Sequence, residues 1–323
     1  MRYIFVLIFF SFAAQAQAFD RSLALSHLLQ NISPPGVAPG AVIASPSRQN
    51  PDYFFHWTRD AAITMQIIAK EYGKKNIGAK AKANYQKILE NYYAFSLNNQ
   101  STASLGEPKF FVDGRVFDGP WGRPQNDGPA MRASALILWA NTLLDEGKSN
   151  FVKKFLYGAN PAENSVIKID LEFVSRHWAE PSFDLWEEVQ GMHFFTLMVQ
   201  RKALLDGASL AERLFNLPTA AWYREQAAQI TKYLERFWWK NQGYIMATTE
   251  QTGGLDYKFS NLDAAVILGV ILGNTNDSSS SLFNEHILST LLRLQNQFHS
   301  IYWINSNSSL GTAIGRYPED RYN

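Results

Sequence analysis

The chain contains no cysteine among its 323 residues. This absence excludes disulfide bonds, thiolate metal sites and cysteine nucleophiles from any account of the protein's function. An excess of charge of one sign is also lacking, because the formal net charge is only +1 at pH 7. Such a balance offers no electrostatic attraction to nucleic acid or to an acidic partner, so no nucleic-acid partner is expected. The chain is 46% hydrophobic, which is enough for a large buried core.

Long hydrophobic runs are also scarce at the N-terminus, where the apolar run of residues 4–12 is too short to span a bilayer comfortably. Arg2 precedes this run, and Ala16-Gln17-Ala18 follows it as a small-x-small cleavage site. The pattern predicts a signal peptide over residues 1–18 and a mature chain that begins near Phe19. We therefore expect a secreted or periplasmic protein without a membrane partner after cleavage, in preference to an uncleaved anchor.

Neither an alternation of strands and helices nor an internal repeat is present, which argues against a doubly wound parallel sheet and against a simple solenoid. Apolar residues instead recur at helical spacing. Helices are expected at residues 22–30, 81–97, 165–178, 219–240, 264–272 and 282–298, with others after Asp60, after Pro129 and from Phe194. The helix after Asp60 is expected to bury Ile63, Ile67, Ile68 and Tyr72. Long loops that carry Trp, Arg, Asp and Glu precede several of these helices. If the helices form antiparallel pairs around a ring, those loops gather on one face.

Aromatic residues are abundant, with 9 Trp, 14 Tyr and 22 Phe, and such rings suit the recognition of flat ligands as well as core packing. The most informative stretch is Trp186-Glu187-Glu188, which precedes the apolar run Phe194–Val199. We expect the two glutamates in a loop or in the first turn of a helix, where the helix dipole favours acidic groups. An acid beside an indole is also the arrangement that a sugar-cleaving enzyme needs, because partial desolvation raises the pKa of a proton donor.

Two further loops carry aromatic and charged side chains directly before a helix. The first runs over residues 53–60 and ends in Arg59 and Asp60, which taken alone are explained as an ion pair at a helix start. The second covers residues 119–129 and contains Arg123 and Asp127. We expect Arg123 to fix its own loop through an ion pair, and Asp127 to cap the helix that follows.

Four stretches together resemble glycoside hydrolase family 15, the glucoamylases: Pro51–Asp60, Trp121–Ala130, Asp184–Val189 and Gly315–Asp320. The resemblance covers residues 19–323 and includes the order and spacing of the stretches. It implies an all-α fold, an (α/α)6 barrel with an inner ring of helices inside an outer ring. It also implies a monomer that hydrolyses terminal α-1,4-linked glucose from starch or maltooligosaccharides with inversion, without a metal or an organic cofactor.

The resemblance assigns roles by position. Glu187 matches the general acid, Glu188 a neighbouring substrate-binding carboxylate, and Arg59 with Asp60 the pair that grips the terminal glucose. The other substrate-binding positions are the aromatic walls Tyr53, Trp57, Trp121 and Trp186, the basic contact Arg316, and the late acids Glu319 and Asp320. We expect about one of the four aromatic residues to be a core residue and not a wall of the site.

One departure from the family pattern concerns the second carboxylate, the general base that an inverting hydrolase needs. In the family it follows the Gly-Arg-Tyr-Pro-Glu-Asp loop, and the chain stops three residues after that loop. We therefore expect a catalytic domain of residues 19–323 that lacks the last helices of the barrel, so that the barrel is incomplete at the C-terminus, and that lacks the base. Alternatives are a non-catalytic α-glucan-binding protein or a chain whose open barrel aggregates.

Overall fold

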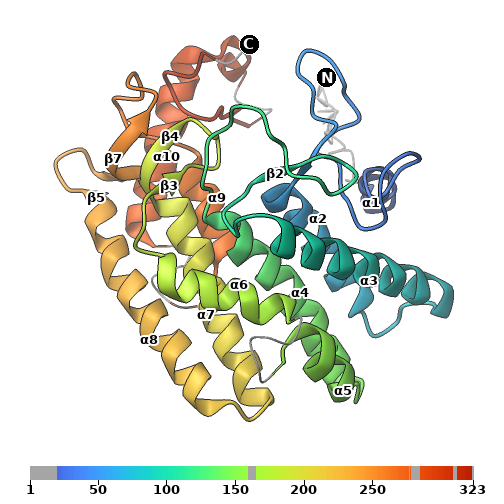
Figure 1. Cartoon of the computed structure of the whole chain (residues 1–323). Coiled ribbons are helices and arrows are strands. Elements are labelled where there is room, and N and C mark those ends of the chain that lie inside the picture. Colours follow the sequence, from blue (N-terminus) through green and yellow to red (C-terminus); the bar gives the residue numbers. More distant parts are fainter. Residues whose placement is uncertain (1–19, 159–164, 276, 278–283, 308–310, 322–323) are drawn as a thin grey trace, which may run out of the picture.

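The computed structural model describes residues 20–158, 165–275, 277, 284–307 and 311–321 (Figure 1). The expected signal peptide lies outside the described residues. The helices are α1 Arg21–Gln30, α2 Thr58–Tyr72, α3 Ala79–Thr102, α4 Asp127–Asp145, α5 Ser149–Phe151, α6 Val166–His177, α7 Phe194–Arg213, α8 Leu217–Leu234, α9 Ala265–Gly273 and α10 Glu285–Ile301, with a π-helical turn at Val152–Leu156 and 3-10 turns at Glu235–Phe237 and Trp303–Ser306. The short strands are β1 His56–Trp57, β2 Lys109–Phe110, β3 Ser182–Phe183, β4 Val189–His193, β5 Trp238–Trp239, β6 Tyr244–Ile245 and β7 Thr248–Gly254.

The longer helices alternate between an inner and an outer layer. In the inner layer α2 packs on α4, α4 on α7, and α7 on α9. Each inner helix also packs on an outer one, since α3 lies against α2, α6 against α4, α8 against α7 and α10 against α9. The described residues thus form four inner–outer helix pairs, and the expected all-α fold is confirmed.

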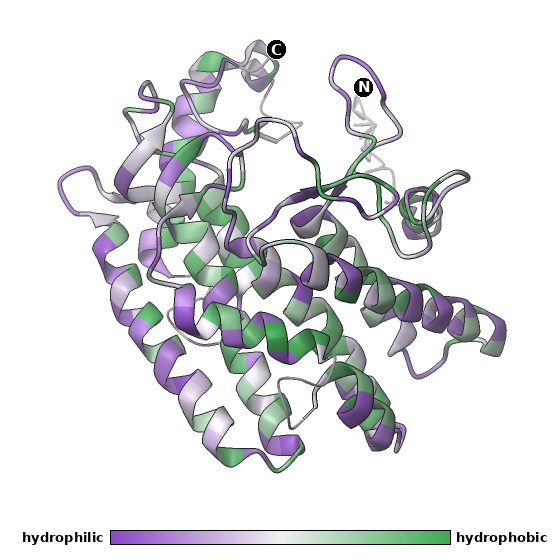
Figure 2. Cartoon of the chain, viewed as in Figure 1, coloured by the Kyte–Doolittle hydropathy of each residue, from purple (hydrophilic) through white to green (hydrophobic). Residues whose placement is uncertain are grey.

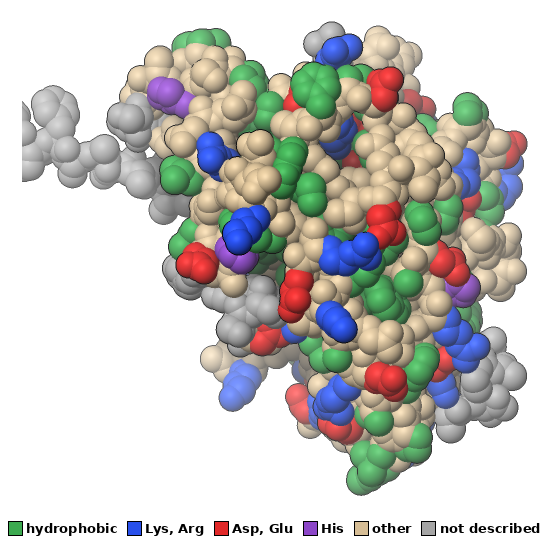
Figure 3. All heavy atoms as spheres, turned by 90° about the vertical axis from the view of Figure 1, so that its left-hand side faces the viewer, with side chains coloured by type: hydrophobic (Ala, Val, Ile, Leu, Met, Phe, Trp, Pro, Cys, Tyr) green, Lys and Arg blue, Asp and Glu red, His purple; other side chains and the backbone are tan. Residues whose placement is uncertain are grey.

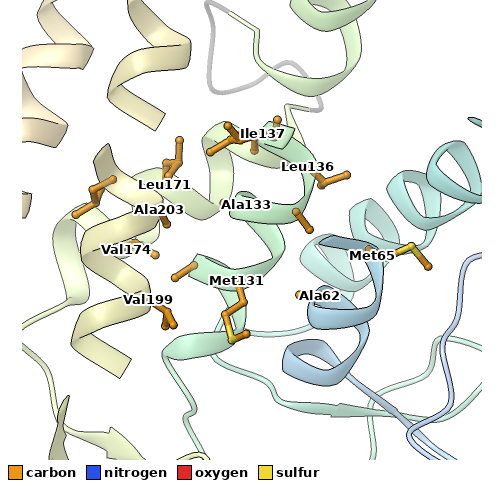
Figure 4. Packing of buried hydrophobic residues seen from close by; sticks show 14 of the residues in the cluster. Ala62, Met65, Met131, Ala133, Leu136, Ile137, Leu171, Val174, Val199 and Ala203 are labelled. Carbon is orange, nitrogen blue, oxygen red and sulfur yellow. The ribbon is translucent and has the colours of Figure 1, made fainter. Parts of the chain in front are cut away.

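The inner helices are apolar on most of their surface because they are covered on several sides. Almost every residue of α4 from Asp127 to Ala140 is buried, and small alanines at 133 and 135 let the neighbouring helices approach closely. In Figure 4 side chains from α2, α4, α6 and α7 pack together, among them Ala62, Leu171 and Val199. Hydrophobic colouring likewise concentrates on the helices in the middle of the molecule, whereas the outer helices α3 and α8 carry polar residues along their length (Figure 2).

The strands and the long loops lie at one end of the helices, at the top of Figure 1. Strand β1 pairs antiparallel with β2, and β3, β4 and β7 form a three-stranded antiparallel sheet. Of the two places expected for Glu187 and Glu188, the structure has the loop: both lie in the β3–β4 turn, and α7 begins only at Phe194. The expected gathering of the loops on one face is confirmed.

The outer surface carries no continuous charged region on the face drawn in Figure 3, where acidic and basic side chains are interspersed. This distribution agrees with the near-zero net charge of the sequence. Within the described ranges, none of the helices combines the length and the apolar character required to cross a bilayer.

Candidate active site

A cavity of about 820 Å³ opens among the loops at the end of the inner helices. It brings together nine of the residues that the resemblance singled out, although they come from four separate stretches of the chain. These residues are Tyr53, Trp57, Arg59, Asp60, Trp121, Trp186, Glu187, Glu188 and Arg316. All four expected aromatic walls line the cavity, and one of them, Trp57, is at the same time a buried core residue with 5% exposure. The remaining lining is largely apolar and includes Ile63, Leu185 and Leu268.

The β3–β4 turn that carries the two glutamates is held by Asp184. The Oδ1 atom of Asp184 accepts hydrogen bonds from the backbone N–H groups of Glu188, at 2.7 Å, and Val189, at 3.0 Å, while its carbonyl accepts from the N–H of Glu187 at 2.9 Å. Glu187 adopts φ = +68°, a conformation that costs a non-glycine residue free energy and that persists because the surrounding turn imposes it. The neighbouring backbone at Gly254 approaches so closely that a Cβ atom there would lie 2.1 Å from the Glu188 carbonyl oxygen.

The carboxylate of Glu187 is oriented through one of its oxygens. Its Oε1 accepts hydrogen bonds from the indole Nε1 of Trp57, at 2.8 Å, and from Nε2 of Gln125, at 3.0 Å. The Nη2 atom of Arg59 lies 3.6 Å from the same oxygen. Among the described residues none donates a hydrogen bond to Oε2, so that oxygen is available to a ligand in the cavity.

Arg59 connects several residues in this part of the site through hydrogen bonds and ion pairs. Its Nη1 donates to Oε1 of Gln125 and to Oδ2 of Asp127, both at 2.9 Å. Burial alone would lower the pKa of the guanidinium, but the carboxylates of Asp127, Asp60 and Glu187 raise it above its usual value. Arg59 is therefore charged at all accessible pH values and links α2 to the start of α4 and to Glu187.

Asp60 differs from the other acids because its side chain is 44% exposed and faces the cavity. Its closest cationic partner is Arg59, whose Nε lies 3.9 Å from Oδ2. Desolvation by the surrounding protein raises the pKa of Asp60; Arg59 opposes this effect, and the negative charges of Glu187 and Asp127 add to it. Two carboxylate oxygens open to the cavity are suitable acceptors for the hydroxyl groups of a ligand.

Replacement of Arg59 by lysine should lower the free energy of unfolding by about 1.5–3 kcal/mol, because a single ammonium cannot reproduce the planar fork that reaches both Gln125 and Asp127. Urea denaturation measures the loss. The matched control is Arg115→Lys, since Arg115 pairs with Asp113 at the surface and its replacement should change stability by less than about 0.5 kcal/mol. Equal losses of unfolding free energy in the two variants would show that Arg59 contributes no more to stability than an arginine of a surface ion pair.

Glu188 lies on the other side of the site and is also tied by the protein. Its Oε1 accepts from Nη1 of Arg316 at 2.9 Å and its Oε2 from the hydroxyl of Tyr317 at 2.7 Å. Arg316 makes two further hydrogen bonds to the carboxylate of Asp320, at 2.7 and 2.5 Å. Glu188 and Arg316 both line the cavity, so Arg316 brings the C-terminal segment of the described chain to this wall.

Lys258 is a site residue that the sequence-based reasoning missed. Its Nζ lies 3.0 Å from Asp263, 3.3 Å from Asp184 and 3.8 Å from Glu188. Asp263 in turn accepts a hydrogen bond from the indole Nε1 of Trp186 at 2.9 Å. Burial works against the charge of Lys258, but Asp263 and the other two carboxylates raise its pKa overall. Lys258 comes from the β7–α9 loop, where it lies between Tyr257 and Phe259 without belonging to a motif of characteristic spacing.

Four predicted polar residues lie behind the cavity wall. The carboxylate of Glu319 accepts from the backbone N–H and the hydroxyl of Ser260, and Asp320 pairs with Arg316; neither acid lines the cavity. Arg123 fixes its loop as expected, through Glu107 at 2.6 Å and through two backbone carbonyl groups. Asp127 does not cap α4. It is the first residue of that helix, and its carboxylate binds Arg59.

Metal-binding groups do not emerge from this arrangement. In the part of the chain that the structure describes, no set of three or more His, Asp or Glu side chains is placed to hold a metal ion. The chemistry that the cavity offers is instead that of carboxylates between aromatic rings. In this cavity an acid that is held by an indole lies beside further aromatic rings, at the loop end of the paired helices.

Comparison with known proteins specifies the family. The family model described as "Glycosyl hydrolases family 15" matches residues 22–323, and the chain belongs to this family. It is 42% identical over 302 residues to glucoamylase 1 of Rhizopus oryzae, and the match covers 92% of the chain and 48% of that protein. It is 39% identical over 312 residues to a glucoamylase of Blastobotrys adeninivorans, covering 93% of the chain and 50% of the relative.

Solved structures agree with this assignment. The glucoamylase of Saccharomycopsis fibuligera superimposes with a TM-score of 0.80 at 36% identity, over 93% of the chain and 66% of that structure. The Hypocrea jecorina glucoamylase gives a TM-score of 0.82 at 33% identity, over 93% of the chain and 51% of that structure. The (α/α)6 class is therefore confirmed, with four of its six helix pairs in the described residues. The chain spans about half the length of the curated relatives it matches.

Proposed function

We propose that the cavity binds the non-reducing end of an α-1,4-linked glucan and that Glu187 is the general acid of an inverting hydrolysis which releases glucose from starch or maltooligosaccharides. The observation that carries this proposal is the orientation of Glu187. Its Oε1 is fixed by Trp57 and Gln125, which leaves Oε2 to face a ligand between aromatic walls. Such an acid is suited to protonate a glycosidic oxygen.

The sugar would be recognised by the other residues of the cavity. The indole and phenol rings of the wall offer apolar faces to pyranose rings, and the exposed carboxylate of Asp60 can accept two hydroxyl hydrogen bonds. Arg316 and Glu188 hold one another at 2.9 Å and present a polar edge to the next sugar along the chain. The relatives described as glucoamylases give the same substrate class.

The inverting step also requires a base that activates water. Asp60 and Glu188 are the other carboxylates that line the cavity, and in this proposal both bind sugar. No residue of the described part is assigned as the base. A second candidate function is the binding of α-glucans without hydrolysis, because the aromatic walls and the exposed carboxylate of Asp60 can hold a sugar whether or not a base is present.

Proton NMR of the glucose released from maltoheptaose tests the proposal and separates the two functions. Hydrolysis with inversion gives β-glucose as the first product, whose anomeric signal is distinct from that of α-glucose. Initial release of α-glucose would contradict inversion. Binding of acarbose by calorimetry together with no release of glucose would establish the binding function, and absence of both would refute the assignment of the cavity.

A further inference from the structure

Lys109 is a buried amine inside a ring of aromatic side chains. Its Nζ lies 3.5 Å from the ring centroid of Trp121 and 4.6 Å from that of Trp57. The rings of Phe55 and Phe117 are each 4.1 Å away. Lys109 is 3% exposed, and no described residue gives its ammonium an ion pair or a hydrogen bond. The ammonium group of Lys109 is therefore surrounded by four aromatic faces where an exposed lysine would be surrounded by water.

The four rings also contact one another in a closed circle, which we call the Lys109 cage. Phe55 and Trp57 have centroids 5.9 Å apart, and Trp57 and Trp121 are again 5.9 Å apart. Phe117 closes the circle, at 5.7 Å from Trp121 and 5.3 Å from Phe55. Three of these contacts are edge-on and one is tilted, geometries that aromatic pairs prefer.

Strand pairing sets this arrangement. Trp57 in β1 lies directly opposite Lys109 in β2, and side chains of residues that face each other across two strands lie on the same side. The backbone N–H of Phe117 donates to the carbonyl of Lys109 at 3.1 Å. This hydrogen bond brings the ring of Phe117 next to the Lys109 side chain. Backbone pairing thus places Lys109 among the rings, and its low exposure leaves the side chain little room outside the cage.

Simple space filling does not explain a lysine at this position. A methionine would fill the same volume without the cost of desolvating a charge. Attraction between an ammonium and aromatic faces is directional and draws each ring toward the charge. Two of the four rings, Trp57 and Trp121, line the cavity, whereas Lys109 does not. Trp57 also donates the 2.8 Å hydrogen bond to Glu187.

We propose that Lys109 is a positioning residue: its ammonium holds the Trp57 and Trp121 wall in place from behind and, through Trp57, holds the carboxylate of Glu187. The proposal rests on the proposed function only in the choice of an α-glucan as the ligand. Lys109 touches no ligand itself. Its effect on binding must therefore pass through the two indoles.

The charge of Lys109 titrates close to neutrality. Burial lowers the pKa of its ammonium to about 8; Glu187 and Asp52 oppose this shift, and Arg123 adds to it. Above pH 8 the attraction to the rings disappears, so ligand affinity should fall. The effect on stability has the opposite sign. Since the folded-state pKa lies below the usual value of 10.5, the cost of the buried charge is removed as the pH rises above 8.

Calorimetric titration with acarbose between pH 6 and 9.5 tests the proposal. Wild-type affinity should fall about tenfold across a transition near pH 8, the size expected for loss of one buried cation–π site. Lys109→Met should bind about tenfold more weakly at pH 6.5 and show no transition near pH 8. Lys109→Arg, which stays charged, should bind without that transition. Lys87→Met, at an exposed position, should match the wild type.

A second measurement does not depend on the ligand. Tryptophan fluorescence of the ligand-free protein should change with an inflection near pH 8, because the charge beside Trp57 and Trp121 disappears there, and the inflection should be missing in Lys109→Met. If acarbose fails to bind at any pH while the inflection is present, the proposed function is refuted, but the interaction of the Lys109 charge with Trp57 and Trp121 is supported. If the wild type shows no inflection, or if Lys109→Met binds acarbose like the wild type, the proposal is overturned.

Discussion

Replacement of Glu187 by glutamine should reduce the release of glucose from maltoheptaose by about 10²–10⁴-fold, the contribution typical of a general acid. The substitution removes the transferable proton and little else. The amide oxygen of glutamine can accept the same hydrogen bonds that Oε1 takes from Trp57 and Gln125. The strained φ of +68° is kept as well, since the turn is held by Asp184. Initial rates at saturating substrate measure the effect.

Two controls separate loss of the proton from loss of the site. Acarbose should bind Glu187→Gln within about threefold of the wild type, because a neutral amide retains the polar contacts of the turn. Hydrolysis of α-glucosyl fluoride, whose leaving group needs no proton, should fall much less than that of maltoheptaose. Glu235→Gln, at an exposed position, serves as the matched variant with unchanged rates. An unaltered rate on maltoheptaose in Glu187→Gln would exclude Glu187 as the acid.

The sequence was informative where a local pattern has a local cause. Helical spacing predicted the inner and outer helices, because a helix that is buried on one face must repeat its apolar residues with that period. The motifs around Trp57, Trp121, Glu187 and Arg316 could be grouped only through the family resemblance. Nothing in their spacing shows that four loops meet in one cavity. That convergence is a property of the tertiary arrangement.

The burial of particular side chains was harder to predict. Periodicity placed Ile63 and Ile67 on the buried side of α2, yet they are 37% and 40% exposed, and Ile63 lines the cavity. An apolar side chain that faces a binding cavity has the same pattern in the sequence as one that faces a core. Asp127 is a related case, because an acid at a helix start suggested a cap, and the buried partner Arg59 lies 68 residues away.

Charged residues that act behind the cavity wall left no signal in the sequence. Lys109 lies in the short strand β2 and Lys258 in the loop before α9, and neither belongs to a motif with characteristic spacing. Their partners are defined by contacts between distant parts of the chain, such as the 74 residues between Lys258 and Asp184. A single sequence does not contain such pairings, so the structure was needed to find them.

Replacement of Lys258 by methionine should lower the free energy of unfolding by about 3–5 kcal/mol, the cost of leaving buried charges without their partner. Asp263 and Asp184 have side chains only 1% and 6% exposed, and Lys258 is the cation within 3.3 Å of both. Without it the two carboxylates must take up protons or admit water. Urea denaturation at pH 7 measures the loss, with Lys240→Met at an exposed position as the control expected to change stability by less than about 0.5 kcal/mol.

A second substitution shows whether charge is the cause. Asp263→Asn in the Lys258→Met background removes one uncompensated carboxylate, while the amide oxygen can still accept from Trp186. The double variant should therefore be more stable than Lys258→Met alone, as expected for two residues that interact directly. Acarbose affinity should follow the same order, because Asp263 orients Trp186 and Lys258 lies 3.8 Å from Glu188. The two side chains would instead contribute independently if Asp263→Asn lowered the free energy of unfolding by the same amount in the Lys258→Met background as in the wild type.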